Sequence, residues 1–183
     1  SRHDVKSREM EKQILTNEED VNKATKKAGY ESANILDYPD NQFDTVSLLE
    51  IIRSIEGLIS DFNPDVVFTH HLGDLNIDHR ISSQAVFTAL RPLREKKPII
   101  ASFETPSSTE WQFPDTNLVF NPNLFIPLTK KNVKAKMEAI KAYRNEIRAY
   151  PHPRSAEALE VIAKKWGTVI GADYAEAFKL HRW

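Results

Sequence analysis

The sequence predicts a layered α/β domain whose sheet is largely parallel and is flanked by helices. Short apolar runs of strand length alternate along the chain with longer segments of helical periodicity, which is typical of this fold class. The 183-residue length fits one domain with a buried core, so we expect a single domain over residues 1–183. Histidine, aspartate and asparagine, residue types that commonly bind ligands, gather at the end of one apolar run. In open α/β sheets, ligands bind at the carboxyl edge of the strands.

The first third of the chain is predicted to hold two helices and a short strand. In Lys6 to Ala28 the apolar residues fall roughly on one helical face, and Gly29 is a common type of helix end. Ala33 to Leu36 is a candidate strand. Thr45 to Phe62 carries a wide apolar stripe at helical spacing, and Asn63-Pro64 stops the helix.

The middle third predicts a strand, a helix and a second strand. The apolar run from Asp65 to Phe68 is typical of a buried strand. A helix is expected over Ile81 to Leu90, followed by a strand over Pro98 to Phe103. Glu104 to Asn117 is predicted as a long polar loop.

The last third should begin with two short β segments, Leu118 to Phe120 and Leu124 to Ile126. Thr129 is a suitable cap for a helix running to about Arg148. Prolines flank His152, so its segment cannot be helical. The remaining expected elements are a helix from Ser155 to Ile170 and a closing strand from Tyr174 to Trp183.

Composition excludes several classes of function. The net charge is −1 with acids and bases interspersed, so the chain has no electrostatic footprint for nucleic acid. It has no cysteine, so a metal must be bound by nitrogen and oxygen. No apolar run has the length of a membrane span, and the polar start lacks a signal peptide, so we expect a cytoplasmic location.

The segment from Thr69 to Arg80 carries most of the chemical information. Between the predicted strand and helix it holds three histidines, two aspartates and an asparagine, a ligand set that suits zinc and similar divalent metals. The alternative is a solvated loop in which Asp78 caps the following helix. His70 and His71 are adjacent on an extended chain and must point apart, so at most one can face a site.

These residues resemble a known family. Asn63-Pro64-Asp65-Val66-Val67, followed by Asp74 to Arg80, resembles the second signature of the PIG-L/LmbE-like de-N-acetylases, which are usually zinc-dependent. The resemblance implies a Rossmann-like fold. Three further stretches are similar to bacterial members, namely Arg8 to Glu11, Asp37 to Asp40, and Pro151 to Ser155 with Tyr174 to Phe178 downstream.

By this resemblance the protein is expected to be a zinc-dependent N-acetylglucosaminyl deacetylase. It would hydrolyse the acetamide of an N-acetylglucosamine-type sugar or glycoconjugate, with Zn²⁺ or another divalent metal as cofactor. His79 is the expected metal ligand, and Asp78 is expected either to orient it or to cap the helix. The other expected site residues are Asn76 and His152 with Asp78 in catalysis, and Arg8, Asp40, Asp74 and Arg154 in substrate binding.

The sequence also departs from the family pattern. The first signature, Ala-His-Pro-Asp-Asp, supplies two metal ligands and the general base, and nothing before Arg8 matches it. We therefore expect the chain to lack an N-terminal segment of its parent protein, and to have weak metal affinity and negligible activity alone. Many members have histidine where Asn76 stands, and His152 is our candidate to replace it as a donor.

Two other functions remain open at this point. The chain could be a catalytically inactive glycan-binding module or fragment without a complete metal site. Alternatively, the segment could be a structural loop in an α/β binding module of unrelated function. The sequence leaves the oligomeric state open, a homo-oligomer included, and it does not identify what carries the sugar.

Overall fold

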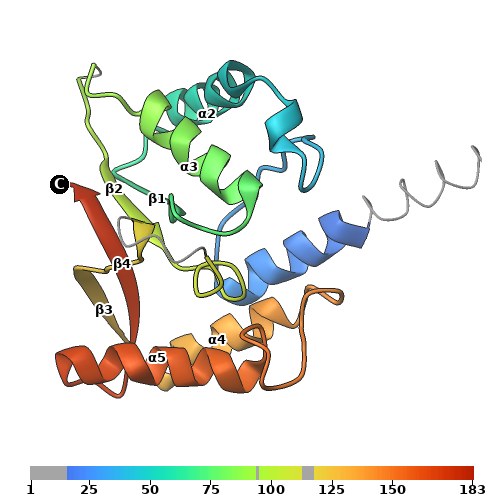
Figure 1. Ribbon diagram of the computed structural model, residues 1–183, viewed down its shortest axis with the longest axis vertical. Helices are drawn as coiled ribbons and strands as arrows, with labels where there is room; N and C mark the ends of the chain where they lie inside the picture. The colour runs from blue at the N-terminus through green and yellow to red at the C-terminus, as the bar shows by residue number, and fades with distance from the viewer. Residues whose placement is uncertain (1–15, 94, 113–117) are drawn as a thin grey trace, which may run out of the picture. The chain divides into compact units, whose positions relative to one another are not determined.

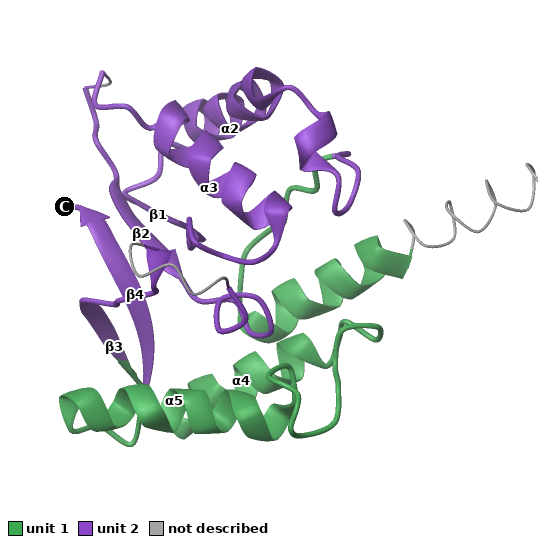
Figure 2. Cartoon of the chain, in the orientation of Figure 1, with its two compact units in different colours: residues 1–36, 127–174 green, residues 37–126, 175–183 purple. Residues whose placement is uncertain are grey.

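The computed structural model describes residues 16–93, 95–112 and 118–183 (Figure 1). The chain forms two compact units, each built from two separate stretches of sequence. Figure 2 shows unit 1, residues 1–36 with 127–174, and unit 2, residues 37–126 with 175–183. The prediction of a single domain over the whole chain stays a prediction.

In the described part of the chain, the sheet has four strands in the order β1-β2-β4-β3. β1 (Val66–His70) pairs in parallel with β2 (Ile99–Phe103), whereas β2 pairs antiparallel with β4 (Tyr174–Arg182). β3 (Leu124–Leu128) completes the sheet. The expectation of a largely parallel sheet is therefore corrected to a mixed one, because the order of elements along a sequence does not fix the direction in which the last strand returns.

Two helices of unit 2 lie side by side, and the second of them packs against β1 (Figure 1). They are α2 (Leu48–Phe62) and α3 (Ile77–Ala89). A short 3-10 helix, η1 (Phe43–Thr45), precedes α2. As predicted, α2 ends at Asn63, and the structure shows this residue in the left-handed conformation. Their apolar side chains form the core with the middle of β2, and its buried members are Ile51, Ile52, Ile59, Ala85, Ala89, Leu90 and Ile100.

β1 is an edge strand in the described part of the chain, not the buried strand that its apolar run predicts. The Val66 and Phe68 side chains remain 40% and 46% exposed, although Phe68 contacts the Phe178 ring at 4.8 Å. Thr69, which points to the opposite face, is buried. Local sequence can reveal a strand, but burial on its second face depends on which segments come to cover it.

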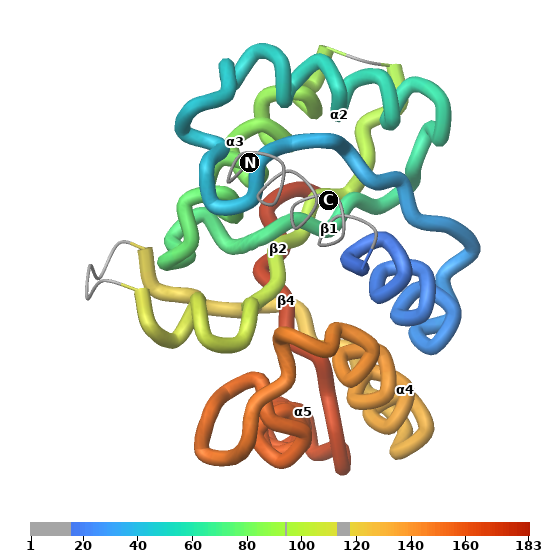
Figure 3. Tube along the Cα trace, turned by 90° about the vertical axis from the view of Figure 1, so that its right-hand side faces the viewer, coloured from blue at the N-terminus to red at the C-terminus, as the bar shows by residue number. Residues whose placement is uncertain are grey.

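Unit 1 is helical. Residues 16–28 form a helix, and Gly29 with φ 85° follows it, as the sequence predicts. α4 (Lys130–Ile140) and α5 (Ala156–Ile170) lie side by side (Figure 3). The buried Asp20 carboxylate accepts from the Arg144 guanidinium at 2.8–2.9 Å and from its backbone N–H at 3.2 Å, so it ties the first helix to the segment after α4.

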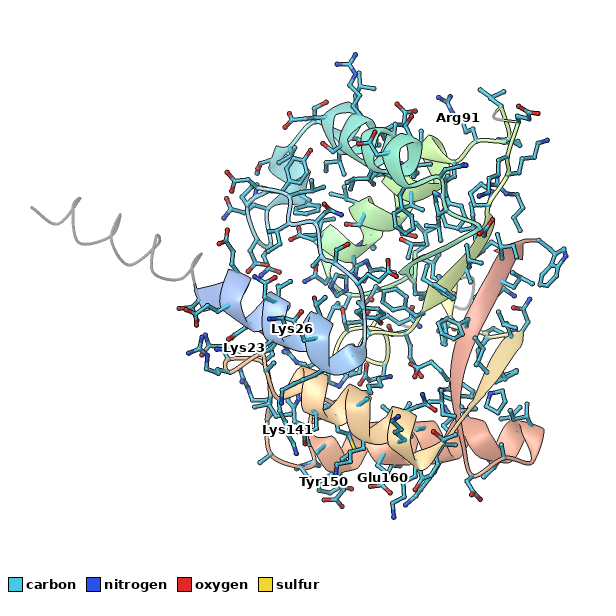
Figure 4. All side chains as sticks on the ribbon, turned by 180° about the vertical axis from the view of Figure 1, so that it is seen from behind. Lys23, Lys26, Arg91, Lys141, Tyr150 and Glu160 are labelled. Carbon is cyan, nitrogen blue, oxygen red and sulfur yellow. The ribbon has the colours of Figure 1, made fainter. Side chains whose placement is uncertain are left out.

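The polar surface of unit 1 is visible in Figure 4. Lys23 and Lys26 extend from the helix over residues 16–28, and Lys23 forms an exposed ion pair with Glu19 one turn away. Lys141 follows α4 and pairs with Glu138. Such surface pairs contribute little stability. We therefore assign the attachment of the first helix to the segment after α4 to the contact between Asp20 and Arg144.

Several predicted boundaries are wrong. Residues 33–36 and 118–120 do not form strands, and the helix after Thr129 ends at Ile140 rather than near Arg148. α3 begins at Ile77, four residues before its predicted start. The cap at Thr129, the helix predicted from Ser155 to Ile170 (α5 begins one residue later, with Ser155 as its cap), the non-helical segment around His152, and the closing strand β4 are confirmed.

Candidate functional site

The carboxyl end of β1 separates its two adjacent histidines as the extended chain requires. The His70 ring stacks on His79, with centroids 4.1 Å apart and planes 11° from parallel. His71 instead lies with its Nε2 2.7 Å from the Leu118 carbonyl oxygen and its ring edge against Phe120. The prediction that at most one of the pair faces the site is confirmed, and that residue is His70.

Asp74 is the carboxylate that contacts His79. Its Oδ2 lies 3.1 Å from His79 Nδ1, and its side chain is fully buried. Burial raises the pKa of Asp74, but hydrogen bonds from His79 and Ser108 outweigh burial and hold that pKa below its usual value. Asp74 is therefore an ionised acceptor inside the protein. Its Oδ1 has no hydrogen-bond partner among the described residues.

Asn76, not Asp78, is the N-cap of α3. Its side-chain oxygen accepts from the backbone N–H groups of Asp78 and His79, at 2.8 and 3.4 Å. Its amide nitrogen donates to Asn41 Oδ1 at 3.0 Å. Asparagine is a preferred cap because its oxygen satisfies otherwise unpaired amides of the first turn, so the sequence did carry this signal. The cap fixes His79 in that turn.

Asp78 has a different contact from the one expected of it. Its carboxylate accepts from the backbone N–H groups of Asn41 and Phe43, at 2.6 and 3.0 Å. Asp78 thus attaches the loop before α2 to the start of α3. The expectation that it orients His79 or caps the helix is corrected, because Asp74 contacts the imidazole and Asn76 forms the cap.

Two residues of the loop after β2, Ser108 and Thr109, have no role among the predictions made from the sequence. Ser108 Oγ accepts from the Asn76 N–H at 3.1 Å, and its carbonyl accepts from Leu75 N–H. Thr109 Oγ1 donates to Asp74 Oδ2 at 3.4 Å. These contacts join segments more than 30 residues apart, so only the Ser-Ser-Thr composition of the loop could have drawn attention to them.

Gly73 lies in the loop between β1 and α3, at a position with no room for a side chain. A Cβ there would be 2.2 Å from the Leu118 carbonyl oxygen. We expect Gly73→Ala to lower the free energy of unfolding by about 1–3 kcal/mol, because the Leu118 segment must move. Gly57→Ala is the matched control: Gly57 is exposed in α2 with open space around it, so alanine should raise stability by roughly 0.5–1 kcal/mol. Urea denaturation measures both, and equal effects would contradict the contact.

His70 makes stability depend on pH. Burial, reinforced by the neighbouring His79, lowers the pKa of His70 to about 4. The unfolded chain, with an ordinary histidine pKa near 6.5, then binds more protons between these values. We expect the contribution of His70 to the free energy of unfolding to be fully present above pH 6.5. The free energy of unfolding should then fall by roughly 3 kcal/mol as the pH drops to 4.

Urea denaturation across this pH range tests the assignment. His70→Phe keeps an aromatic ring beside His79 but cannot bind a proton, so its stability should change much less between pH 6.5 and 4. Protonation of Asp74 lowers the free energy of unfolding only at lower pH, because the pKa of its folded form lies below 3.8. Parallel pH profiles for wild type and His70→Phe would show that His70 is not the titrating group.

The other predicted site residues are more dispersed. Arg8 lies outside the described residues, and Asp40 is exposed in a turn. His152 and Arg154 belong to unit 1, where His152 Nδ1 accepts from the Arg154 N–H at 3.1 Å and the Arg154 guanidinium pairs with Glu146. Asp74, Asn76, Asp78 and His79 come together within unit 2. The roles predicted for all of them in catalysis and substrate binding stay predictions.

The described residues fit one position of a zinc site and not a whole one. No group of three or more His, Asp or Glu side chains in this part of the chain could hold a metal ion. His79 has the required arrangement for one ligand, because a buried carboxylate occupies its Nδ1 and Nε2 is left over. In the same residues, no helix is long and apolar enough to span a membrane.

Comparison with known proteins identifies the family. The family model for PIG-L, described as GlcNAc-PI de-N-acetylase, matches residues 1–90. The search of curated proteins gave no match. Among solved structures, the conserved protein TT1542 from Thermus thermophilus superposes with a TM-score of 0.69 at 21% identity, covering 91% of this chain and 73% of that one.

Two deacetylases also share the fold. The N,N'-diacetylchitobiose deacetylase from Pyrococcus horikoshii gives a TM-score of 0.69 at 16% identity, covering 92% of this chain and 64% of its own. The zinc-inhibited form of teicoplanin deacetylase Orf2 gives a TM-score of 0.59 at 16% identity. The match covers 85% of this chain and 59% of that one. The chain thus spans less than two thirds of both deacetylases. With the ordered set of motifs, these findings show that the chain belongs to the PIG-L/LmbE-like family of de-N-acetylases.

Proposed function

We propose that the full-length protein is a metal-dependent hydrolase that removes the N-acetyl group from an N-acetylglucosamine-type sugar or glycoconjugate. The observation that carries this proposal is the Asp74–His79 pair at the carboxyl end of β1. Family membership supports the reaction type, and the chitobiose deacetylase with the same fold supports a sugar substrate. The proposal concerns the whole protein, because the chain covers only part of such deacetylases.

Zinc is the proposed cofactor, with His79 Nε2 as the ligand from the described residues. When bound, such a metal activates water and polarises the acetamide carbonyl. The zinc-inhibited teicoplanin deacetylase shows that this fold can bind the ion. Among the described residues, His79 belongs to no group of three or more candidate ligands that could hold the ion.

The residues of this chain would share the remaining work. His152 accepts at Nδ1 from a backbone N–H, so its proton resides on Nε2, which is then a donor for the developing oxyanion. Asn76 and Asp78 hold the first turn of α3 and the loop over residues 41–43 that lies against it. Arg8, Asp40 and Arg154 are the proposed contacts to substrate hydroxyl groups.

An acetate-release assay tests the proposal. The full-length protein is incubated with N-acetylglucosamine or N,N'-diacetylchitobiose, with added zinc and after chelation. A simple N-alkylacetamide serves as the control for sugar specificity. We expect metal-dependent acetate release from the sugars, and negligible release by residues 1–183 alone. Sugar binding without release would favour the alternative of an inactive glycan-binding module, and neither binding nor release would reject both functions.

A further inference from the structure

Two carboxylates lie near the start of α3, and their contacts differ. Asp78 binds backbone N–H groups of the loop before α2, whereas Asp74 contacts the His79 imidazole. We propose that Asp74 is a positioning residue that fixes His79 with its proton on Nδ1, so that the lone pair on Nε2 is directed away for a metal. This inference deepens the proposed metal role of His79 and rests on it.

The Asp74 carboxylate is held firmly in place. It is fully buried, and Thr109 Oγ1 donates to the same oxygen that contacts His79. Its backbone is fixed as well, because the Arg80 guanidinium donates to the carbonyl oxygens of Asp74 and Leu75 at 2.7 and 2.5 Å. A carboxylate restrained in this way cannot rotate toward solvent, so it is not available to a substrate hydroxyl in this conformation.

The His79 ring is restrained from three sides. The Asn76 cap places it in the first turn of α3, and Asp74 contacts its Nδ1. The nearly parallel His70 ring covers one of its faces at 4.1 Å. These contacts remove most of the ring's rotational freedom, so the direction of Nε2 is set before any metal binds.

The chemistry of the contact determines the tautomer. An ionised carboxylate only accepts hydrogen bonds, so His79 Nδ1 must carry the proton that it donates. The neutral imidazole then has its lone pair on Nε2, which is the form that binds a metal. Removing an outer carboxylate of this kind typically weakens metal affinity by about 10- to 100-fold.

This role differs from the substrate contact that the sequence predicts for Asp74. A residue that binds a sugar hydroxyl must reach the surface, and the Asp74 side chain does not. The loop bearing Ser108 and Thr109 also has a function in this arrangement, because Thr109 Oγ1 donates a hydrogen bond to the Asp74 carboxylate. We therefore expect Thr109→Val to change the tautomer population of His79 less than Asp74→Ala does.

Long-range ¹H–¹⁵N NMR of the histidine side chains tests the proposal without any activity assay. In metal-free residues 1–183 at pH 7.5, His79 should show the Nδ1–H tautomer. In Asp74→Ala, a substantial population should change to the Nε2–H tautomer. Asp78→Asn is the matched control, because it removes a charge one position from His79 without touching the ring, and its tautomer should stay that of wild type.

Zinc added to the same samples gives a second measurement. The ¹⁵N resonance of His79 Nε2, rather than Nδ1, should move, and Asp74→Ala should need about tenfold more zinc for the same change. An Nε2–H or doubly protonated His79 in wild type would overturn the proposal, even if Asp74→Ala fails to fold. If the tautomer is as expected but the full-length protein releases no acetate, the proposed function fails and this inference stands.

Discussion

Replacing His79 with alanine in the full-length protein is expected to abolish metal binding and, with it, acetate release. His79 is the one metal ligand that we assign from the described residues, and Asp74 and Asn76 both act to fix it. A catalytic zinc site has about three protein ligands and keeps one position for water, so losing one ligand removes a large part of the affinity. Elemental analysis of purified protein should change from about one zinc per chain to none.

His181→Ala is the matched control for this experiment. His181 lies on β4, where its ring contacts Phe87 and hydrogen-bonds Ser102, and it has no contact with His79 among those described. This variant should keep its zinc and its activity. Circular dichroism should show that both variants are folded. Unchanged zinc in His79→Ala would refute the assignment of His79 as a ligand.

Helix ends were largely predictable because their signals are local. Thr129 caps α4 and Asn63 ends α2 as expected, and α5 begins within one residue of its predicted start at Ser155. The start of α3 was harder because Asn76 and Asp78 are both good caps two residues apart. The structure selects Asn76, since its oxygen reaches the amides of the second and third helical residues while the Asp78 carboxylate is engaged with the loop over residues 41–43.

Strand pairing was predicted less well because it depends on distant segments. Residues 33–36 have a strand-like composition, yet they lie exposed and outside any described strand. The β1 run is apolar enough for a buried strand, but two of its side chains remain substantially exposed. The direction of β4 also follows from tertiary structure, because an alternating pattern is the same in parallel and antiparallel neighbours.

The candidate site shows the same division. The motif and the family resemblance identified His79 and the residues around it, and the geometry of an extended chain separated His70 from His71. The choice between Asp74 and Asp78 as the partner of His79 was wrong, because side-chain direction in a loop is not encoded by spacing. The Thr109 contact to Asp74 joins residues 35 positions apart, which no local pattern could reveal.

His152 carries the second large prediction, a loss of turnover with the metal retained. Asn76 cannot act as a charged donor, and its side chain is already engaged as the cap of α3. His152 lies between two prolines, which reduces the entropy lost on ordering its loop, and its Nδ1 accepts from the Arg154 N–H. The proton is thus on Nε2, where it can donate to a developing oxyanion.

Losing such a donor typically lowers kcat by about 100- to 1,000-fold, so His152→Ala in the full-length protein should show this loss. His152→Gln keeps a neutral donor and should lose less. Zinc content should be unchanged in both, and thermal unfolding should show that the loop still folds without the Nδ1 contact. KM should change less than kcat, because the donor acts mainly in the transition state. If both variants turn over like wild type, His152 is a surface residue, and His70, whose ring contacts His79, becomes the next donor to test.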